Sequence, residues 1–461
     1  MKVELTGHYG IWRLIRTSIP SIAMMIITSV YSVVDGFFVS NFAGTTAFAS
    51  LNLVWPVIAL LSALGLMTGT GGSALVSKLL GEGNGDKARS VFTMIVFLTF
   101  VAGVIFSILL LVLMRPLVLA LGAEGEMVRL SVRYGRIVAC GLPGLTLQMA
   151  FQSFYMTAEK PQLGTVMSII CGVINIILDA LFVAVFGWGL TGAAVATAIA
   201  LAVGGAYPLI FFASKRNNSH LRFVKFSSID WKSIAKTCTN GMSEYVGNIA
   251  LSIVSIGYNF QLMKYVGENG VSAYGIIMYL AFILAAVFIG YNLCVSQIIA
   301  FNYGARNRAE LRSLLRKSIG IIAVSGLLLT GTAELLAPAI SKIFVGYDPQ
   351  LCDLTVRALR IYMLCFLICG FNMFCSAWFT ALNNGLVSAV AAFARTLVFE
   401  LASVFVLPAF LGIDGIWMAV NVAEILAFIL SAVLILSYRE RYLGARSLKD
   451  GFFYPINRIW G

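Results

Sequence analysis

The chain has 461 residues, of which 60% are hydrophobic and 11% are charged, and its formal net charge is +12. Soluble proteins contain about 25% charged residues, so this composition excludes a water-soluble globular protein and indicates that lipid surrounds most of the chain. The basic excess does not indicate a nucleic-acid partner, because the basic residues lie between the apolar segments, where they act as topology signals.

Apolar segments long enough to cross a hydrocarbon core of about 30 Å recur along the whole chain. The start, residues 1–20, lacks the short apolar stretch and cleavage site of a signal peptide, so no removable leader is expected. The sequence predicts twelve transmembrane helices, at residues 15–40, 47–70, 91–114, 130–156, 163–186, 190–213, 236–265, 271–299, 315–336, 355–380, 387–411 and 414–437.

The connections between these helices alternate in charge. On one side of the predicted membrane lie 23 of the 32 Lys and Arg residues, and this side includes both termini and the central linker. Cytoplasmic loops carry the excess of Lys and Arg. We therefore expect a multi-pass protein of the inner (plasma) membrane with both termini in the cytoplasm.

The chain also contains an internal repeat. The loop from Gly81 to Ser90 matches the loop from Gly304 to Ser313 at an offset of 223 residues, with Asn84 aligned to Asn307. Six helices per repeat give both halves the same orientation, so the expected fold is all-α, with two six-helix lobes related by a pseudo-twofold axis along the membrane normal. The expected divisions are an N-terminal lobe (1–213), a cytoplasmic linker (214–235), a C-terminal lobe (236–437) and a cytoplasmic tail (438–461).

Polar residues within predicted spans are costly and therefore mark candidate functional sites. In the N-terminal lobe, counting residues from the external turns puts one set of side chains about 12–14 Å below the external surface. Two carboxylates with amide, hydroxyl and phenol oxygens can bind a hard cation or a proton. The predicted cation-coupling residues are Asp35, Tyr134, Asn175, Asp179 and Thr197. Pro20 either kinks the first helix or lies in its first turn.

The C-terminal lobe has a different set of charged residues. Tyr258 occupies the repeat position of Asp35, so the carboxylate site is not duplicated. Glu400 and Glu424 lie twelve residues on either side of Gly412 and so share a depth of about 18 Å, near the midplane. Arg395 either neutralises one glutamate or leaves both available to a substrate. The predicted substrate pathway is lined by Glu244, Arg395, Glu400 and Glu424.

These features together resemble the multidrug and toxic compound extrusion family, in particular the prokaryotic branch related to DNA-damage-inducible protein F. The resemblance covers nearly the whole chain. It implies that protonation or sodium binding at the N-terminal acids bends the first helix and drives drug release. Glu244 resembles the seventh-helix acid of sodium-coupled members, but the tenth-helix acid of those members has no counterpart within residues 355–380.

The favoured function is a proton- or sodium-coupled antiporter that exports amphiphilic, often cationic small molecules by alternating access. We expect no cofactor beyond the coupling ion, H⁺ or Na⁺, no other metal and a monomer in the lipid bilayer. An alternative is a lipid-linked oligosaccharide flippase, which should line its cavity with several cations, whereas only Arg395 lies well within a span. An enzyme is disfavoured, because His8 and His220 lie outside the spans and no CxxC pair exists.

Overall fold

The computed structural model describes residue 5 and residues 7–42, 45–214, 217–225, 229–346 and 348–444; within these, the side chains of residues 31–37, 40–42, 45, 48 and 268 are not described. The described chain is helical. The elements are α1 (Ile11–Phe42), α2 (Thr45–Gly81), α3 (Gly85–Ala120), α4 (Gly125–Thr157), α5 (Pro161–Asp179), η1 (Ala180–Val185), α6 (Leu190–Ala213), α7 (Trp231–Tyr265), α8 (Glu268–Gly304), α9 (Arg308–Val345), α10 (Pro349–Met363), α11 (Phe366–Ala381), α12 (Gly385–Phe393), η2 (Ala394–Glu400), α13 (Leu401–Val406), α14 (Pro408–Leu411), α15 (Ile413–Ser437) and α16 (Arg439–Leu443).

The number of membrane spans agrees with the sequence prediction. Eleven helical segments of the described chain are long and apolar enough to cross a bilayer, and α10 with α11 forms a twelfth that is bent by 46°. The bend falls at Leu364 and Cys365, between the two helices. The sequence predicted one span here, at residues 355–380; the bend was not predicted, and neither Leu364 nor Cys365 is a helix breaker.

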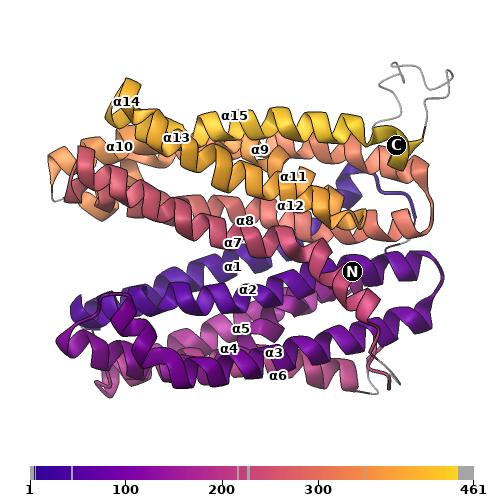
Figure 1. The fold of residues 1–461 in the computed structure, drawn as a ribbon, viewed down its shortest axis with the longest axis horizontal. Helices are drawn as coiled ribbons and strands as arrows, with labels where there is room; N and C mark the ends of the chain where they lie inside the picture. Colours follow the sequence, from indigo (N-terminus) through magenta and orange to yellow (C-terminus); the bar gives the residue numbers. More distant parts are fainter. Residues whose placement is uncertain are drawn as a thin grey trace.

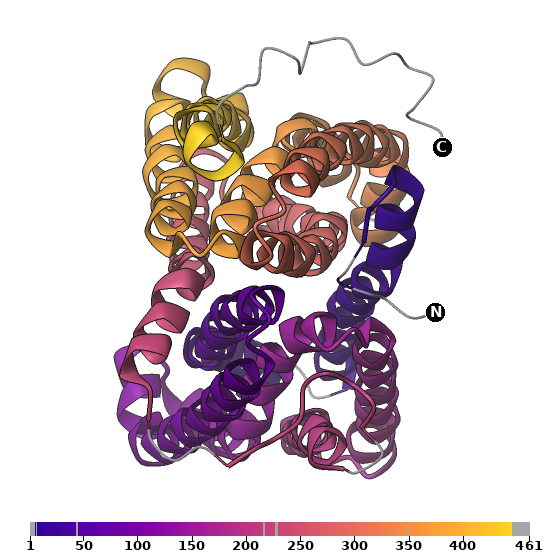
Figure 2. The same ribbon diagram turned by 90° about the vertical axis from the view of Figure 1, so that its right-hand side faces the viewer.

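The helices form two bundles that lie side by side (Figure 1). The first bundle contains α1–α6 and the second contains α7–α15. Figure 2 shows the start of α1 beside helices of the second bundle, and α1 packs against α8 as well as against α5. The lobe boundaries at 213 and 236 stay a prediction, but the two groups of helices match its outline.

The backbone repeats between the bundles at the predicted offset. Gly189 begins α6 with φ 56° and ψ −137°, and Gly412, 223 residues later, begins α15 with φ 59° and ψ −135°. Both glycines are needed because L side chains rarely adopt this conformation. Glu159 and Asn383, 224 residues apart, both have φ 57°. The two bundles are therefore built on the same turn geometry.

The two bundles touch closely at one end of the molecule, where the α2–α3 and α8–α9 connections and the first and last described residues lie. We call it the basic end after the Lys and Arg residues of these connections. A Cβ added at Gly81 would lie 2.0 Å from Phe301 O, and one added at Gly304 would lie 2.0 Å from Lys78 O. Each contact is the repeat of the other at the 223-residue offset. Helices α2 and α8 therefore cross at a pair of glycines on the pseudo-twofold axis.

Buried hydrogen bonds reinforce this closure. Gln297 of α8 accepts from Ser77 Oγ at 3.0 Å and from Thr157 Oγ1 at 3.1 Å, and its amide donates to Ser73 Oγ at 3.0 Å. All four residues are buried, so the contact joins the second bundle to α2 and α4 of the first without water.

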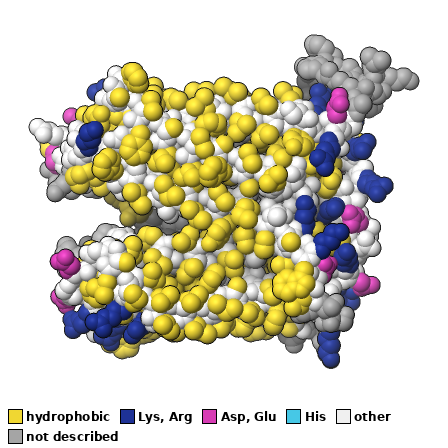
Figure 3. All heavy atoms as spheres, viewed as in Figure 1, with side chains coloured by type: hydrophobic (Ala, Val, Ile, Leu, Met, Phe, Trp, Pro, Cys, Tyr) yellow, Lys and Arg dark blue, Asp and Glu magenta, His cyan; other side chains and the backbone are white. Residues whose placement is uncertain are grey.

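The opposite end of the molecule is open. In Figure 3 the surface is hollowed between the two bundles at the left; dark-blue Lys and Arg side chains lie at both ends of the molecule and are more numerous at the right, the basic end. Apolar side chains cover the middle of both bundles, as expected for a surface in contact with lipid. The structure is therefore open between the bundles on the side where the sequence predicts the external face.

Candidate functional site

The first bundle places several predicted coupling residues in its interior. Asp179 is the last residue of α5, directly before the π-helix η1, and it is fully buried, while Asn175 is 2% exposed. Tyr134 of α4 is 1% exposed and Thr197 of α6 is 9% exposed. A buried carboxylate is costly unless it is protonated or compensated, so the interior formed by α4, α5 and α6 contains a group that is suited to bind a cation or a proton.

Two of these residues are in direct contact. Asn175 Nδ2 donates to Thr197 Oγ1 at 3.5 Å, which joins α5 to α6. Asn175 Oδ1 is buried and has no hydrogen-bond partner among the described residues. A buried carbonyl oxygen without a partner is available to coordinate an ion, since leaving it unsatisfied costs about 1–3 kcal/mol.

The side chain of Asp35, one of the predicted coupling residues, is not among those that the structure describes. Its backbone is helical in α1, which packs against both α5 and η1. Helix α1 continues through Pro20, whose carbonyl oxygen accepts from Thr165 Oγ1 at 2.6 Å. The predicted kink at Pro20 stays a prediction.

The second bundle contains a buried ion pair. Arg395 Nε and Nη2 donate to Glu424 Oε1 at 2.8 and 2.6 Å, and Asn372 Nδ2 donates to Glu424 Oε2 at 2.6 Å. Ser431 Oγ in turn donates to Asn372 Oδ1 at 3.0 Å. Glu424 is 4% exposed, so its charge is fully compensated inside the bundle. Of the two alternatives, the structure shows that Arg395 neutralises one glutamate, and that it is Glu424.

Two acids remain near this pair. Glu400 and Glu244 are both half-buried, and neither forms an ion pair with another described residue. Glu400 is close enough to Arg395 and Glu424 to interact with both charges, and Glu244 is close enough to interact with Arg395. Three acids therefore face one base, which leaves a negative excess when all are ionised.

The π-helix η2 brings part of this group together. Arg395 and Glu400 are five residues apart, at its two ends. In a π-helix residues i and i+5 are joined by a backbone hydrogen bond and lie on nearly the same side, whereas an α-helix would rotate them apart. Counting residues predicts how deep a side chain lies in the membrane but not which way it points, so neither this π-helix nor the part played by Asn372 was predicted.

Three tyrosines lie near the unpaired acid. Tyr258 and Tyr274 stack with ring centroids 4.8 Å apart, and Tyr258 and Tyr362 lie 6.3 Å apart. All three lie near enough to Glu400 for its charge to influence them. Aromatic faces attract organic cations, so this wall and Glu400 favour the same class of ligand.

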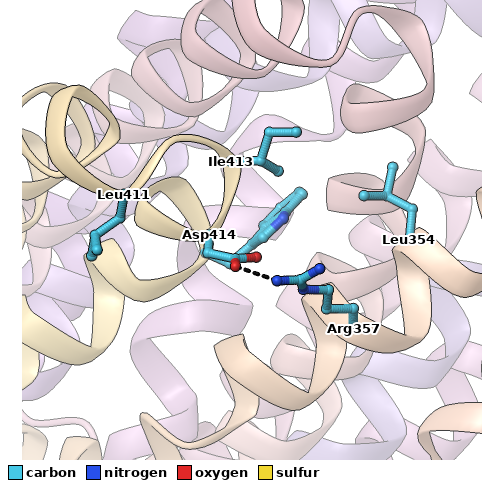
Figure 4. Close-up of a pocket in the computed structure, with 6 residues that line it drawn as sticks. Leu354, Arg357, Leu411, Ile413 and Asp414 are labelled. Carbon is cyan, nitrogen blue, oxygen red and sulfur yellow. Dashed lines mark hydrogen bonds and ion pairs between the residues drawn. The ribbon is translucent and has the colours of Figure 1, made fainter.

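A small pocket of about 280 Å³ lies elsewhere, at the outer end of the second bundle. Figure 4 shows Arg357 directed at Asp414, with which it forms an ion pair between α10 and α15. Apolar side chains complete its wall. The pocket lies at the level of the Gly412 turn, twelve residues from Glu400 and Glu424, and is thus separate from the buried acids.

Comparison with known proteins identifies the family. The MatE family profile matches residues 20–181 and 242–406, one stretch in each bundle. The multidrug export protein MepA of Staphylococcus haemolyticus is 24% identical over 425 residues, which is 92% of this chain and 93% of that protein. MepA of Staphylococcus aureus strain MSSA476 is 21% identical over 430 residues, with the same two coverages, 92% and 93%.

Solved structures confirm the fold. A multidrug resistance MATE family transporter of the MOP superfamily, in its outward-facing conformation, superposes with a TM-score of 0.88 at 22% identity, covering 94% of this chain and 98% of that one. The match to the family profile confirms the family predicted from the sequence, and the absence of an enzymatic role follows from the family. The chain belongs to the MatE family: it is a multidrug and toxic compound extrusion transporter of the membrane and not an enzyme.

Proposed function

We propose that this transporter is a cation-coupled antiporter that exports amphiphilic, often cationic small molecules by alternating access. The observation that carries the proposal is the separation of two acidic sites, one in each bundle, on either side of a cleft that is open at one end only. Two separate sites allow one to bind the coupling ion while the other binds substrate.

The coupling site is the one in the first bundle. Asp179 is fully buried beside a carbonyl oxygen of Asn175 that has no described partner, and Asp35 lies on the neighbouring helix α1. Two carboxylates that share a low-dielectric site do not both ionise readily, so a proton or Na⁺ is expected to neutralise them. Tyr134 and Thr197 supply further oxygens to the same interior.

The substrate site is the one in the second bundle. Because Arg395 is held by Glu424, it presents no free cation to an anionic headgroup, which argues against the flippase alternative. Glu400 and Glu244 form no ion pair among the described residues, and stacked tyrosines lie near Glu400. A desolvated organic cation gains most from a fixed negative partner in such a low-dielectric site.

The test compares Glu400→Gln with the wild type for export of one cationic and one neutral dye from the same vesicles. The cationic dye should lose about tenfold or more in transport affinity, since one close charge pair in a partly buried site contributes about 1–4 kcal/mol. The neutral dye should be little affected. Equal loss of both dyes, or no loss of either, would contradict the assignment of Glu400.

The proposed setting is the plasma membrane, with a monomer whose termini are both cytoplasmic. The basic end carries the connections with the predicted Lys and Arg excess, which supports this orientation. The related MepA proteins are multidrug export proteins, which supports export of small molecules through the cleft.

A further inference from the structure

The two histidines of the chain contact two acids that the transport sites do not use. His8 Nδ1 lies 2.7 Å from Glu310 Oε2, and His220 Nε2 lies 3.6 Å from Glu159 Oε2. Glu310 is in the first turn of α9 in the second bundle, and Glu159 follows α4 in the first bundle. Both acids are at the basic end, where the bundles close.

The N-terminal segment joins these two acids. The Leu5 backbone N–H donates to Glu159 Oε1 at 2.6 Å, and the Tyr9 backbone N–H donates to Glu310 Oε1 at 2.9 Å. Leu5 is 3% exposed and Tyr9 is 1% exposed. We call the described residues 5 and 7–9 the N-terminal strap. Hydrogen bonds from backbone N–H groups to carboxylates are charge-assisted and about twice as strong as neutral ones.

The two anchors of the strap differ in strength. At the Glu310 anchor, Lys317 Nζ also donates to the Tyr9 carbonyl oxygen and lies 3.3 Å from His8 Nε2. Arg13 adds a hydrogen bond to the His8 carbonyl oxygen at 3.1 Å. The Glu159 anchor has one backbone hydrogen bond and a longer contact to His220. The strap therefore stays on the second bundle when the Glu159 anchor breaks.

The strap also has a limited reach. Four residue steps separate the two anchored N–H groups, and an extended chain covers at most about 3.3–3.6 Å per residue, or about 14 Å in all. Opening the basic end, as alternating access requires, moves Glu159 away from Glu310. The strap must then release the weaker anchor, so the hydrogen bond from Leu5 to Glu159 counts toward the closed state only, and it forms only while Glu310 holds the strap in place.

We infer that Glu310 is a positioning residue of the transport cycle, which clamps the N-terminal strap across the basic end and so stabilises the state that is closed there. The inference rests on the proposed alternating-access function. It gives Glu310, His8 and Lys317 a role separate from both the coupling site and the substrate site.

The test measures the distance between spin labels at Asp86 and Ala309, two exposed positions at the starts of α3 and α9 that are related by the repeat offset. The full-length protein is studied without substrate or ion gradient. Glu310→Ala should raise the ratio of open to closed molecules at the basic end about tenfold, within the range of typical coupling effects. Glu310→Gln keeps an acceptor for the Tyr9 N–H, so its ratio of open to closed molecules should lie between the ratios of Glu310→Ala and the wild type.

The matched control is Glu126→Ala. Glu126 is also an acid in the first turn of a helix, α4, but it lies at the opposite end, is exposed, and pairs with Arg129 at 2.9 Å. An unchanged distance distribution in Glu310→Ala, or an equal change in Glu126→Ala, would overturn the inference. If Glu310→Ala does not fold, Glu310→Gln decides alone, and an unchanged ratio there contradicts it.

Different results would contradict the proposed function and the proposed role of the strap. A wild-type protein that does not export cations contradicts the function, while a shifted distance in Glu310→Ala would still support the strap. A protein that exports cations but shows no shift in Glu310→Ala contradicts the strap alone.

Discussion

Replacing Gly304 by alanine should push the two bundles apart at the basic end. The new Cβ would lie 2.0 Å from Lys78 O and 2.8 Å from the carbon of the same carbonyl group, whereas ordinary contacts begin at 3.4 Å. Both groups are backbone, so no side chain can rotate away, and α8 must move by about 1 Å or more. Overpacking of this kind costs about 1–3 kcal/mol.

This cost falls on one conformation only. Alanine also favours the helix over glycine by about 1 kcal/mol, but that gain is the same whichever end of the cleft is open. The ratio of molecules open at the basic end to molecules closed there should therefore rise by about 5- to 150-fold. Distances between spin labels at Asp86 and Ala309 measure this ratio directly.

The control is Gly275→Ala in the same helix, where an added Cβ would meet nothing within 4 Å. It should gain helix stability and leave the label distances unchanged. A Gly304→Ala protein with the wild-type distance distribution would refute the argument that this crossing holds the closed state. So would a shift of the same size in Gly275→Ala.

Three further predictions concern stability and topology. Glu424→Gln should destabilise the protein by about 1–3 kcal/mol in thermal unfolding, because it replaces the carboxylate that accepts two charge-assisted hydrogen bonds from Arg395; a loss below about 0.5 kcal/mol, the size of a surface substitution's effect, would contradict this. The Asp230 carboxylate accepts hydrogen bonds from Ser233 at the start of α7, which lowers its pKa. Its contribution is therefore present above the unfolded pKa of about 3.9 and is lost as pH falls through the lower folded value. Asp230→Ala should cost about 1 kcal/mol at pH 7 and progressively less as the pH falls below the unfolded pKa; a melting-temperature difference that does not vary with pH would contradict this. A cysteine introduced at the exposed Arg308 should resist labelling by impermeant reagents from outside the cell, and efficient external labelling there would reverse the proposed orientation.

Much of the fold could be predicted because it depends on the length of the apolar segments and on the spacing of the internal repeat. Twelve apolar segments, the 223-residue offset and the Gly189 and Gly412 turns are properties of sequence order alone. The lipid solvent requires every backbone group to be satisfied within a helix, which leaves few other folds for such a chain.

The site was predicted only in part, because the depth of a residue in the membrane does not determine which way its side chain points. Asn175 and Thr197 were expected at one level, and they do meet. Glu400 and Glu424 were expected at one level too, but whether Arg395 pairs with either depends on the π-helix η2, which has no sequence signal of its own.

Long-range contacts account for the rest. The N-terminal strap joins residues 154 and 301 positions apart through backbone N–H groups, whose partners the sequence does not specify. The bend at Leu364 and Cys365 likewise depends on packing between α8, α9 and α11, and neither residue breaks helices by itself.

The most direct test of cation coupling uses proteoliposomes that hold a cationic dye gradient at equilibrium and then receive an imposed proton or sodium gradient. The wild type should move dye uphill in response to at least one of the two ions, and Asp35→Asn should insert normally yet show no gradient-driven movement. Asp35→Asn with full coupled transport, or a wild type that moves dye only downhill under both gradients, would contradict the account.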